Sequence, residues 1–175
     1  LGAIDRERFD VVAVGISRSG RWSRMSLEEV ADLHITGGAT PEVPEPEHDA
    51  VWLVGDRGGE IATRVGDQLL DVQAVDVVFA LLHGPYGEDG TIQGLFEMAN
   101  VRYVGCGVTS SAISMDKHLT KTVLAAAGID VGSWELVTSL DWEEDSRAVV
   151  ERINALGYPV FVKPCRAGSS IGISK

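Results

Sequence analysis

The segment that most constrains the fold is the apolar run "DVVFALLHG", residues 76–84, together with the turn and the helical pattern directly after it. A run of this length between polar residues predicts a strand buried on both faces, as in a parallel sheet. The stretch "GPYGEDG" then provides the glycines of a turn. In "TIQGLFEMAN", residues 91–100, apolar side chains recur at the spacing of an amphipathic helix. A strand, a turn and a helix in this order are typical of an α/β protein.

Other apolar segments extend this alternation along the chain. Strands are also predicted over residues 8–17, 50–55, 101–105, 133–137, 158–164 and 171–175. Helices are predicted over residues 110–115, 116–128 and 141–157, with Gly128 and Gly157 as their stop signals. Alternating strands and helices predict an α/β fold.

The organisation of the chain changes near residues 107–116. The alternation typical of a Rossmann-like domain gives way there to a helix, a strand and a Gly-rich hairpin. We therefore expect two domains, over residues 1–110 and 111–175. Residues 37–50, rich in Pro, Glu and Gly, are expected to form an exposed loop rather than a linker.

Composition and charge exclude some classes of partner. The 175 residues contain 15 basic and 26 acidic side chains, a net charge of −11. Nucleic-acid binding requires a basic face, so nucleic acid is not an expected partner, whereas a local pair of lysines could still bind a nucleotide. No apolar run approaches the roughly 18 residues of a membrane helix, so no membrane association is expected.

The two cysteines bear on the expected cellular location, and the chain ends bear on the expected extent of the protein. Cys106 and Cys165 lack the spacing of a disulfide framework, which favours a reducing compartment. Because no export signal is present either, a cytoplasmic location is expected. The chain begins at Leu1, and Lys175 falls within a predicted strand. We therefore expect a piece of a longer protein.

A first group of candidate site residues lies just after the strand that ends near His83. In open α/β sheets, ligands bind beyond the carboxyl ends of the strands. His83 and Glu88 lie in this Gly-rich connection, and Asp89 is placed to cap the next helix. The alternative is a plain strand–turn–helix connection with a capping aspartate. No His or Cys spacing here indicates a zinc site.

A second group combines two lysines with the loop "RAGSSIG", residues 166–172. Lys117 is expected in the first turn of a helix, after the capping residue Asp116. Lys163 is expected at the end of a strand, just before a loop whose glycines, hydroxyls and backbone N–H groups could surround phosphate oxygens. The loop lacks the Walker pattern. A surface lysine and a flexible hairpin tip are the alternatives.

These stretches together resemble the D-alanine–D-alanine ligases of the ATP-grasp superfamily. The matching text is "LHGPYGEDGTIQGLFEMANVRYVGCGVTSSAISMDKHLTK" and then "YPVFVKPCRAGSSIGISK". The resemblance is close over about residues 76–128 and 157–175 and weaker over 8–22. It implies an N-terminal Rossmann-like (preATP-grasp) domain with a parallel sheet, followed by the beginning of an ATP-grasp α+β domain.

The resemblance also implies an activity. Enzymes of this family use ATP and Mg²⁺ to join two D-alanines for bacterial peptidoglycan. The first D-alanine is activated as an acyl phosphate, which the amine of the second then attacks. By motif, Lys117, Lys163, Gly168 and Ser170 correspond to ATP-binding residues and Ser169 to a catalytic serine. His83 and Glu88 correspond to the side that binds D-alanine.

Several family features have no counterpart among these 175 residues. The resemblance places a substrate-binding glutamate before residue 1. It places the adenine-binding segment and the Mg²⁺ ligands beyond residue 175, so no metal ligand is assigned here. We therefore expect the 175 residues alone to be inactive as a ligase. The resemblance further implies a homodimer. The alternatives are a ligase that joins D-alanine to D-lactate or D-serine, and an inactive truncated module.

Overall fold

A computed structural model describes residues 3–34, 41–54, 58–168 and 170–175. The chain divides into two compact units, which are described separately. Unit one comprises Leu1–Phe79 and Leu95–Val104, and unit two comprises Ala80–Gly94 and Gly105–Lys175. The predicted domains 1–110 and 111–175 remain a prediction. Of the predicted loop 37–50, residues 37–40 lie outside the described residues.

Unit one begins with an antiparallel hairpin of β1 (Ala13–Ile16) and β2 (Trp22–Met25). The strand predicted over residues 8–17 is therefore shorter than predicted and lies in an antiparallel hairpin. The reason is a tight turn, in which the backbone N–H of Ser17 donates to the carbonyl of Arg21 and reverses the chain at once. The short helix α1 (Leu27–Ala31) follows and is capped by Ser26.

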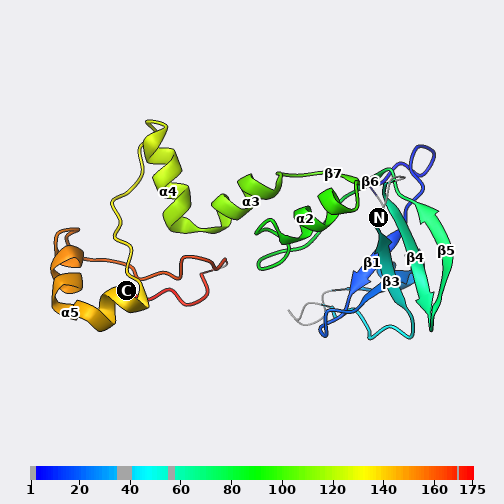
Figure 1. Cartoon of the computed structure of the whole chain (residues 1–175), viewed down its shortest axis with the longest axis horizontal. Helices are drawn as coiled ribbons and strands as arrows, with labels where there is room; N and C mark the ends of the chain where they lie inside the picture. Colours follow the sequence, from blue (N-terminus) through cyan, green and yellow to red (C-terminus); the bar gives the residue numbers. More distant parts are fainter. Residues whose placement is uncertain (1–2, 35–40, 55–57, 169) are drawn as a thin grey trace. The chain divides into compact units, whose positions relative to one another are not determined.

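A three-stranded antiparallel sheet forms the main part of unit one (Figure 1). Its strands are β3 (Asp49–Leu53), β4 (Glu60–Val65) and β5 (Gln68–Ala74). Strands β4 and β5 were not predicted from the sequence. Gly66, at φ +58°, and Asp67 form the two-residue connection between them. A Gly-Asp dipeptide between two strand-like runs is a sequence signal that could have predicted this hairpin.

A β-α-β connection follows the sheet along the chain. β6 (Val77–Val78) pairs in parallel with β7 (Arg102–Tyr103), and α2 (Thr91–Met98) lies between them in sequence. This parallel pair and the helices confirm the mixed α/β class. The helix predicted over 91–100 is confirmed, whereas β6 is much shorter than the strand predicted over 76–84.

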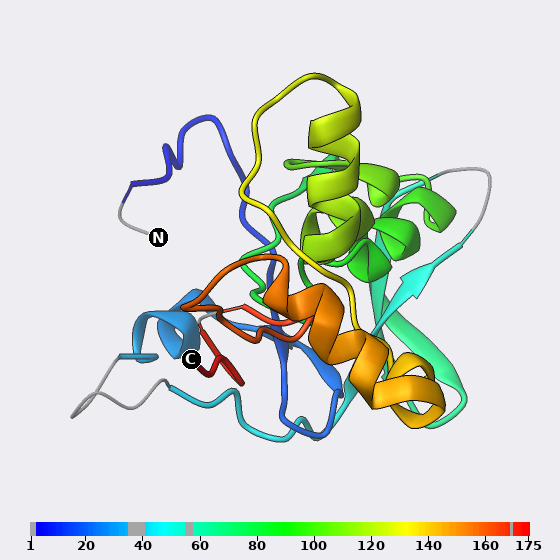
Figure 2. The ribbon, with the colours of Figure 1, turned by 90° about the vertical axis from the view of Figure 1, so that its left-hand side faces the viewer.

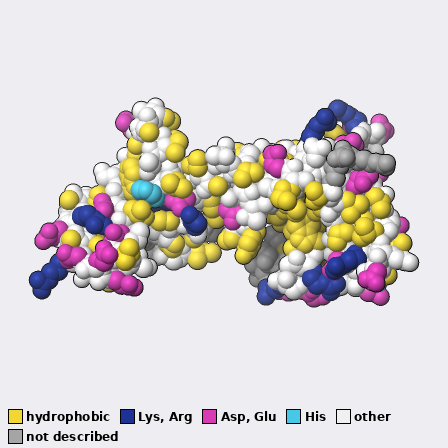
Figure 3. All heavy atoms as spheres, viewed as in Figure 1, with side chains coloured by type: hydrophobic (Ala, Val, Ile, Leu, Met, Phe, Trp, Pro, Cys, Tyr) yellow, Lys and Arg dark blue, Asp and Glu magenta, His cyan; other side chains and the backbone are white. Residues whose placement is uncertain are grey.

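The core of unit one is small and aromatic. Phe96 is only 2% exposed, and its ring centroid lies 5.8 Å from that of Trp52 and 5.6 Å from that of Tyr103. Ile61 and Ala62 of β4 are completely buried. Strand β5, by contrast, leaves large apolar side chains exposed, and hydrophobic side chains gather over unit one in the space-filling view (Figure 3).

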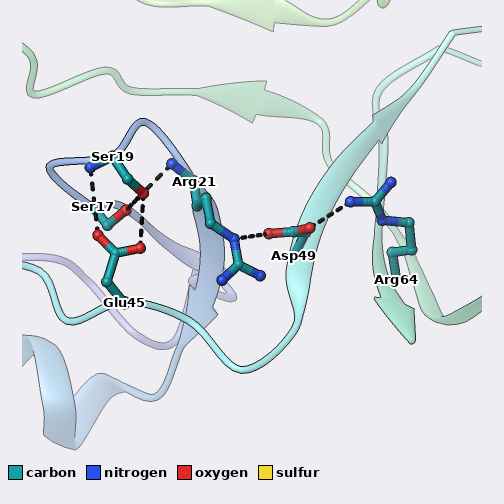
Figure 4. Close-up of polar contacts among 6 residues, drawn as sticks. All are labelled: Ser17, Ser19, Arg21, Glu45, Asp49 and Arg64. Atoms are coloured by element: carbon teal, nitrogen blue, oxygen red, sulfur yellow. Dashed lines mark hydrogen bonds and ion pairs between the residues drawn. The ribbon is translucent and has the colours of Figure 1, made fainter. Parts of the chain in front are cut away.

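A chain of polar contacts joins three segments of unit one at Asp49 (Figure 4). Arg21 Nε donates to Asp49 Oδ1 at 2.8 Å, and Arg64 Nη2 donates to Asp49 Oδ2 at 2.5 Å. Asp49 and Arg64 are also directly opposite each other across β3 and β4. These guanidinium groups, Arg64 first and then Arg21, hold the pKa of the Asp49 carboxyl below its usual value.

This ion triplet makes stability depend on pH in a defined direction. Because the folded-state pKa of Asp49 is lowered, its contribution is present above the unfolded-state pKa of about 3.9 and is lost as pH falls through the lower folded-state value. Between about pH 5 and pH 2, wild type is expected to lose more unfolding free energy than Asp49→Asn does. Urea denaturation at each pH measures this difference, with Asp67→Asn in the β4–β5 turn as the control. Equal losses in wild type and Asp49→Asn would contradict the prediction.

The helices that lie wholly within unit two can be followed in Figure 2. They are α3 (Val108–Met115), α4 (Lys117–Ala126) and α5 (Ser139–Asn154), as predicted to within a few residues. Asp116 caps α4, and Gly128 follows it at φ +77°. Thr138 and Asp141 form a capping box at the start of α5. The helix kinks at Asp145, whose carboxylate accepts the N–H groups of Arg147 and Ala148 and thereby starts a second helical segment.

The strands predicted in unit two are corrected. No strand forms over residues 133–137, where Trp134 Nε1 instead donates to His118 Nδ1 of α4 at 3.1 Å. The strands predicted over 158–164 and 171–175 are reduced to one antiparallel bridge between Val162 and Ser174. The reason in both cases is that a strand requires a partner, and among the described residues these segments have at most one paired position. No helix in the described part of the chain is long and apolar enough to span a membrane.

Candidate active site

The residues predicted for the site all belong to unit two. Those whose positions are described are His83, Glu88, Lys117, Lys163, Gly168 and Ser170. Ser169, the predicted catalytic serine, lies outside the described residues. The described residues form two groups, one in the loop before α2 and one where the start of α4 meets residues 162–174.

In the loop before α2, the carboxylates of Glu88 and Asp89 accept hydrogen bonds from the backbone of the same loop. Glu88 Oε2 accepts the backbone N–H of Gly84 at 2.6 Å, and Glu88 Oε1 lies 3.9 Å from His83 Nδ1. Asp89 accepts the N–H groups of Tyr86 and of Thr91, the first residue of α2, and the Tyr86 N–H above all holds the pKa of the Asp89 carboxyl below its usual value. The side chain of His83 is 90% exposed, so its ring is available to a ligand.

Lys117 is the first residue of α4 and contacts the Gly-rich loop in two ways. Its backbone N–H donates to the Cys165 carbonyl at 3.0 Å, and its Nζ donates to the Ala167 carbonyl at 2.5 Å. The prediction that Lys117 lies in the first turn of a helix is confirmed. The ammonium group is thus held against the Gly-rich loop, residues 166–172, which follows Lys163 in the chain.

Asp116 and Arg166 add a contact that was not predicted from the sequence. Arg166 Nε donates to Asp116 Oδ2 at 3.0 Å, while Asp116 Oδ1 accepts the N–H groups of His118 and Leu119. These contacts, the Leu119 N–H first and Arg166 next, hold the pKa of the Asp116 carboxyl below its usual value. Fifty positions separate the partners, so only the tertiary fold brings them together.

The loop itself is closed at its base and strained near its tip. Val162 and Ser174 exchange two backbone hydrogen bonds, of 2.9 and 3.0 Å. Gly172, at φ +70°, lies against Pro164 so closely that an added Cβ would be 2.9 Å from Pro164 Cγ. Ser170 adopts φ +59°, which is unusual for a residue with a side chain. Gly168 has open space where a Cβ would be, so a ligand could approach its backbone closely.

The structure therefore brings some predicted residues together and not others. Lys117 contacts the carbonyls of Cys165 and Ala167, which belong to the same segment of the chain as Lys163, Gly168 and Ser170. Among the described residues, no hydrogen bond or ion pair joins His83 or Glu88 to Lys117 or to that segment. The described residues also hold no group of three or more His, Cys, Asp or Glu side chains that could bind a metal ion.

Comparison with known families gives consistent matches along the chain. The family model for the D-ala D-ala ligase N-terminus matches residues 1–106, and that for the D-ala D-ala ligase C-terminus matches residues 123–175. Among curated proteins, the D-alanine–D-alanine ligase of Pseudarthrobacter chlorophenolicus is 48% identical over the whole chain and that of Streptomyces coelicolor is 42% identical. The chain spans 46% and 47% of those two proteins, about half their length.

Solved structures of ligases resemble the chain as well. The VanG D-Ala:D-Ser ligase from Enterococcus faecalis matches 99% of the chain with a TM-score of 0.77 and 33% identity, and the chain covers 47% of it. The D-alanine–D-alanine ligase from Coxiella burnetii matches 99% with a TM-score of 0.77 and 31% identity, and the chain covers 46% of it. Since the first family model alone matches more than half of the chain, this chain belongs to the D-alanine–D-alanine ligase family.

Proposed function

We propose that the longer protein to which this chain corresponds is an ATP-dependent ligase that joins two D-alanines for bacterial peptidoglycan synthesis. The observation that carries the proposal is the contact of the Lys117 ammonium group with Ala167 of the Gly-rich loop, which follows Lys163 in the chain. The two segments are far apart in sequence, and each carries one of the lysines expected to bind phosphate. The names of the relatives support the choice of D-alanine.

The predicted ATP-binding residues fit a triphosphate. Lys117 and Lys163 would place positive charge beside it, and Gly168 and Ser170 would contribute backbone N–H groups at close range. ATP would supply the phosphoryl group that activates the first D-alanine carboxylate. Charge stabilisation of this kind accounts for most catalysis of phosphoryl transfer. By the family resemblance, the residues that hold Mg²⁺ would lie beyond residue 175, and no metal ligand is assigned among these residues.

The loop before α2 would serve the amino-acid side of the reaction. Glu88 accepts the backbone N–H of Gly84 and lies 3.9 Å from His83, so it would support the conformation of this loop rather than contact a substrate directly. The exposed His83 ring would then contact the first D-alanine. Ser169 is proposed from its motif alone as the catalytic serine.

The proposal also covers the cellular location, the domain bounds and the oligomeric state of the protein. A ligase that uses ATP and free D-alanine would act in the cytoplasm, and the two free cysteines are compatible with a reducing compartment. Domains over 1–110 and 111–175 and a homodimer remain proposals. Size-exclusion chromatography with light scattering on the full-length protein would test the dimer.

A product assay tests the function. The full-length protein with ATP, Mg²⁺ and D-alanine is expected to form D-alanyl-D-alanine and phosphate, measured by mass spectrometry. Parallel reactions with added D-lactate or D-serine test the alternative acceptors, of which D-serine is favoured by the VanG likeness. Exclusive formation of a mixed product would overturn the choice of D-alanine, and no product from any pair would favour the inactive module. The 175 residues alone are expected to form none.

Ser169 and Cys165, which are four positions apart in the sequence, are expected to differ in importance. Ser169→Ala should lower kcat/KM by about 10- to 100-fold, as expected for the loss of a hydroxyl that positions substrate. Cys165→Ala should have little effect, because the described contact of Cys165 with Lys117 uses its backbone carbonyl. Steady-state kinetics of both variants measure the difference, and equal effects would remove Ser169 from its proposed role.

A further inference from the structure

The pair of Asp116 and Arg166 joins the start of α4 to the Gly-rich loop in a way that the proposed function does not require. The Asp116 side chain is only 11% exposed, whereas that of Arg166 is 75% exposed. One Asp116 oxygen caps α4, and the other accepts the Arg166 guanidinium. A single buried carboxylate therefore fixes both the helix that begins at Lys117 and the loop residue before Ala167.

Three contacts join residues 116 and 117, at the start of α4, to residues 165–167. The Lys117 N–H binds the Cys165 carbonyl, Asp116 binds Arg166, and Lys117 Nζ binds the Ala167 carbonyl. The last contact uses the ammonium group that the proposed function assigns to a phosphate. A phosphate oxygen carries more negative charge than a carbonyl oxygen, so it would displace Ala167 from Lys117 Nζ. After the Ala167 carbonyl is displaced, only the other two of these three contacts would still join the start of α4 to the loop.

We propose that Arg166 is a positioning residue, whose ion pair with Asp116 keeps Ala167 and Gly168 beside Lys117 while Lys117 exchanges the Ala167 carbonyl for nucleotide phosphate. Arg166 itself contacts neither the nucleotide nor the reacting atoms in this scheme. The scheme rests on the proposed function for its kinetic consequence, whereas its structural consequence can be measured without any reaction.

The test uses the full-length protein, three single variants of the ion pair, their double variant Arg166→Ala/Asp116→Asn and one control variant. Arg166→Ala removes the ion pair and leaves the α4 cap intact. Asp116→Asn also removes the ion pair, because the asparagine side chain is neutral. The amide oxygen of that side chain can still accept the N–H groups of residues His118 and Leu119, so the cap of α4 is kept. Arg166→Lys retains the charge and should restore part of the effect. Arg152→Ala is the matched control, because Arg152 Nε forms another ion pair of unit two, with Glu135 at 2.6 Å, and its described partners, Glu135 and Leu136, do not belong to the loop.

Hydrogen exchange without nucleotide is the first readout. In Arg166→Ala and in Asp116→Asn, peptides covering residues 166–174 should exchange about fivefold faster, the scale of losing one partly exposed ion pair. Peptides from α5 should be unchanged in these variants, and peptides covering 166–174 should be unchanged in Arg152→Ala. Because both single changes break the same contact, the double variant should exchange no faster than either single one.

Kinetics are the second readout. Arg166→Ala should raise the KM for ATP about fivefold while changing the KM for D-alanine little, a split that general destabilisation would not produce. Unchanged exchange of 166–174 in Arg166→Ala, or additive effects in the double variant, would overturn the proposal. If Arg166→Ala exchanges faster but the wild-type protein makes no dipeptide, the structural role of the ion pair is retained and the proposed function is overturned instead. Faster exchange with unchanged KM for ATP would overturn the role in nucleotide binding.

Discussion

Replacing Lys163 by alanine in the full-length protein is expected to lower kcat/KM for ATP by about 100-fold or more, through a higher KM for ATP and slower turnover. Lys163 is exposed and directly precedes the loop whose Ala167 carbonyl holds the Lys117 ammonium group. Removing one of two cations leaves negative charge on the phosphates uncompensated, and this loss grows in the transition state. Initial rates of phosphate release at varied ATP and saturating D-alanine measure the effect.

Lys175→Ala provides the matched control for this change. Lys175 is next to Ser174, which bridges to Val162, so both lysines lie at the base of the same closed loop. The resemblance assigns no nucleotide contact to Lys175, and its replacement should leave the KM for ATP nearly unchanged. If Lys163→Ala retains wild-type ATP dependence, Lys163 does not belong to the site. If both variants lose activity equally, general positive charge at the loop base explains the effect better than a specific contact.

The largest expected loss of stability comes from Phe96→Ala in α2. Phe96 is 2% exposed and contacts the rings of Trp52 and Tyr103, which belong to β3 and β7. Removing a buried aromatic ring eliminates its transfer free energy and leaves a cavity, which together lower the free energy of unfolding by about 3–5 kcal/mol. Urea denaturation followed by circular dichroism measures the change.

Met98→Ala in the same helix is the control for Phe96→Ala. Met98 is 71% exposed, so its replacement should change stability by no more than about 0.5 kcal/mol. A loss below about 1 kcal/mol for Phe96→Ala would mean that the three rings do not form the core of unit one. Since a core of this size contains few other large buried side chains, partial unfolding of unit one is the expected consequence at elevated temperature.

Helices could be predicted because their signals are local. Asp116 before α4, Gly128 after it, and the acidic first turn of α5 all act within a few residues of the helix they delimit. Strand predictions were less successful. Residues 133–137 have a strand-like pattern, yet Trp134 binds His118 and no strand forms. The hairpin of β4 and β5 was missed although its Gly66–Asp67 turn was visible in the sequence.

Short segments of the chain are enough to specify the α/β class, the helices of unit two and the family membership, because caps, spacings and motifs are local properties. The antiparallel pairing of β1 with β2, the contact of Lys117 with Ala167 and the ion pair of Asp116 with Arg166 became visible only in the folded molecule. The last two contacts join residues 50 positions apart. No local signal in the chain specifies such partners, since the free energy that selects them arises only when both segments are packed.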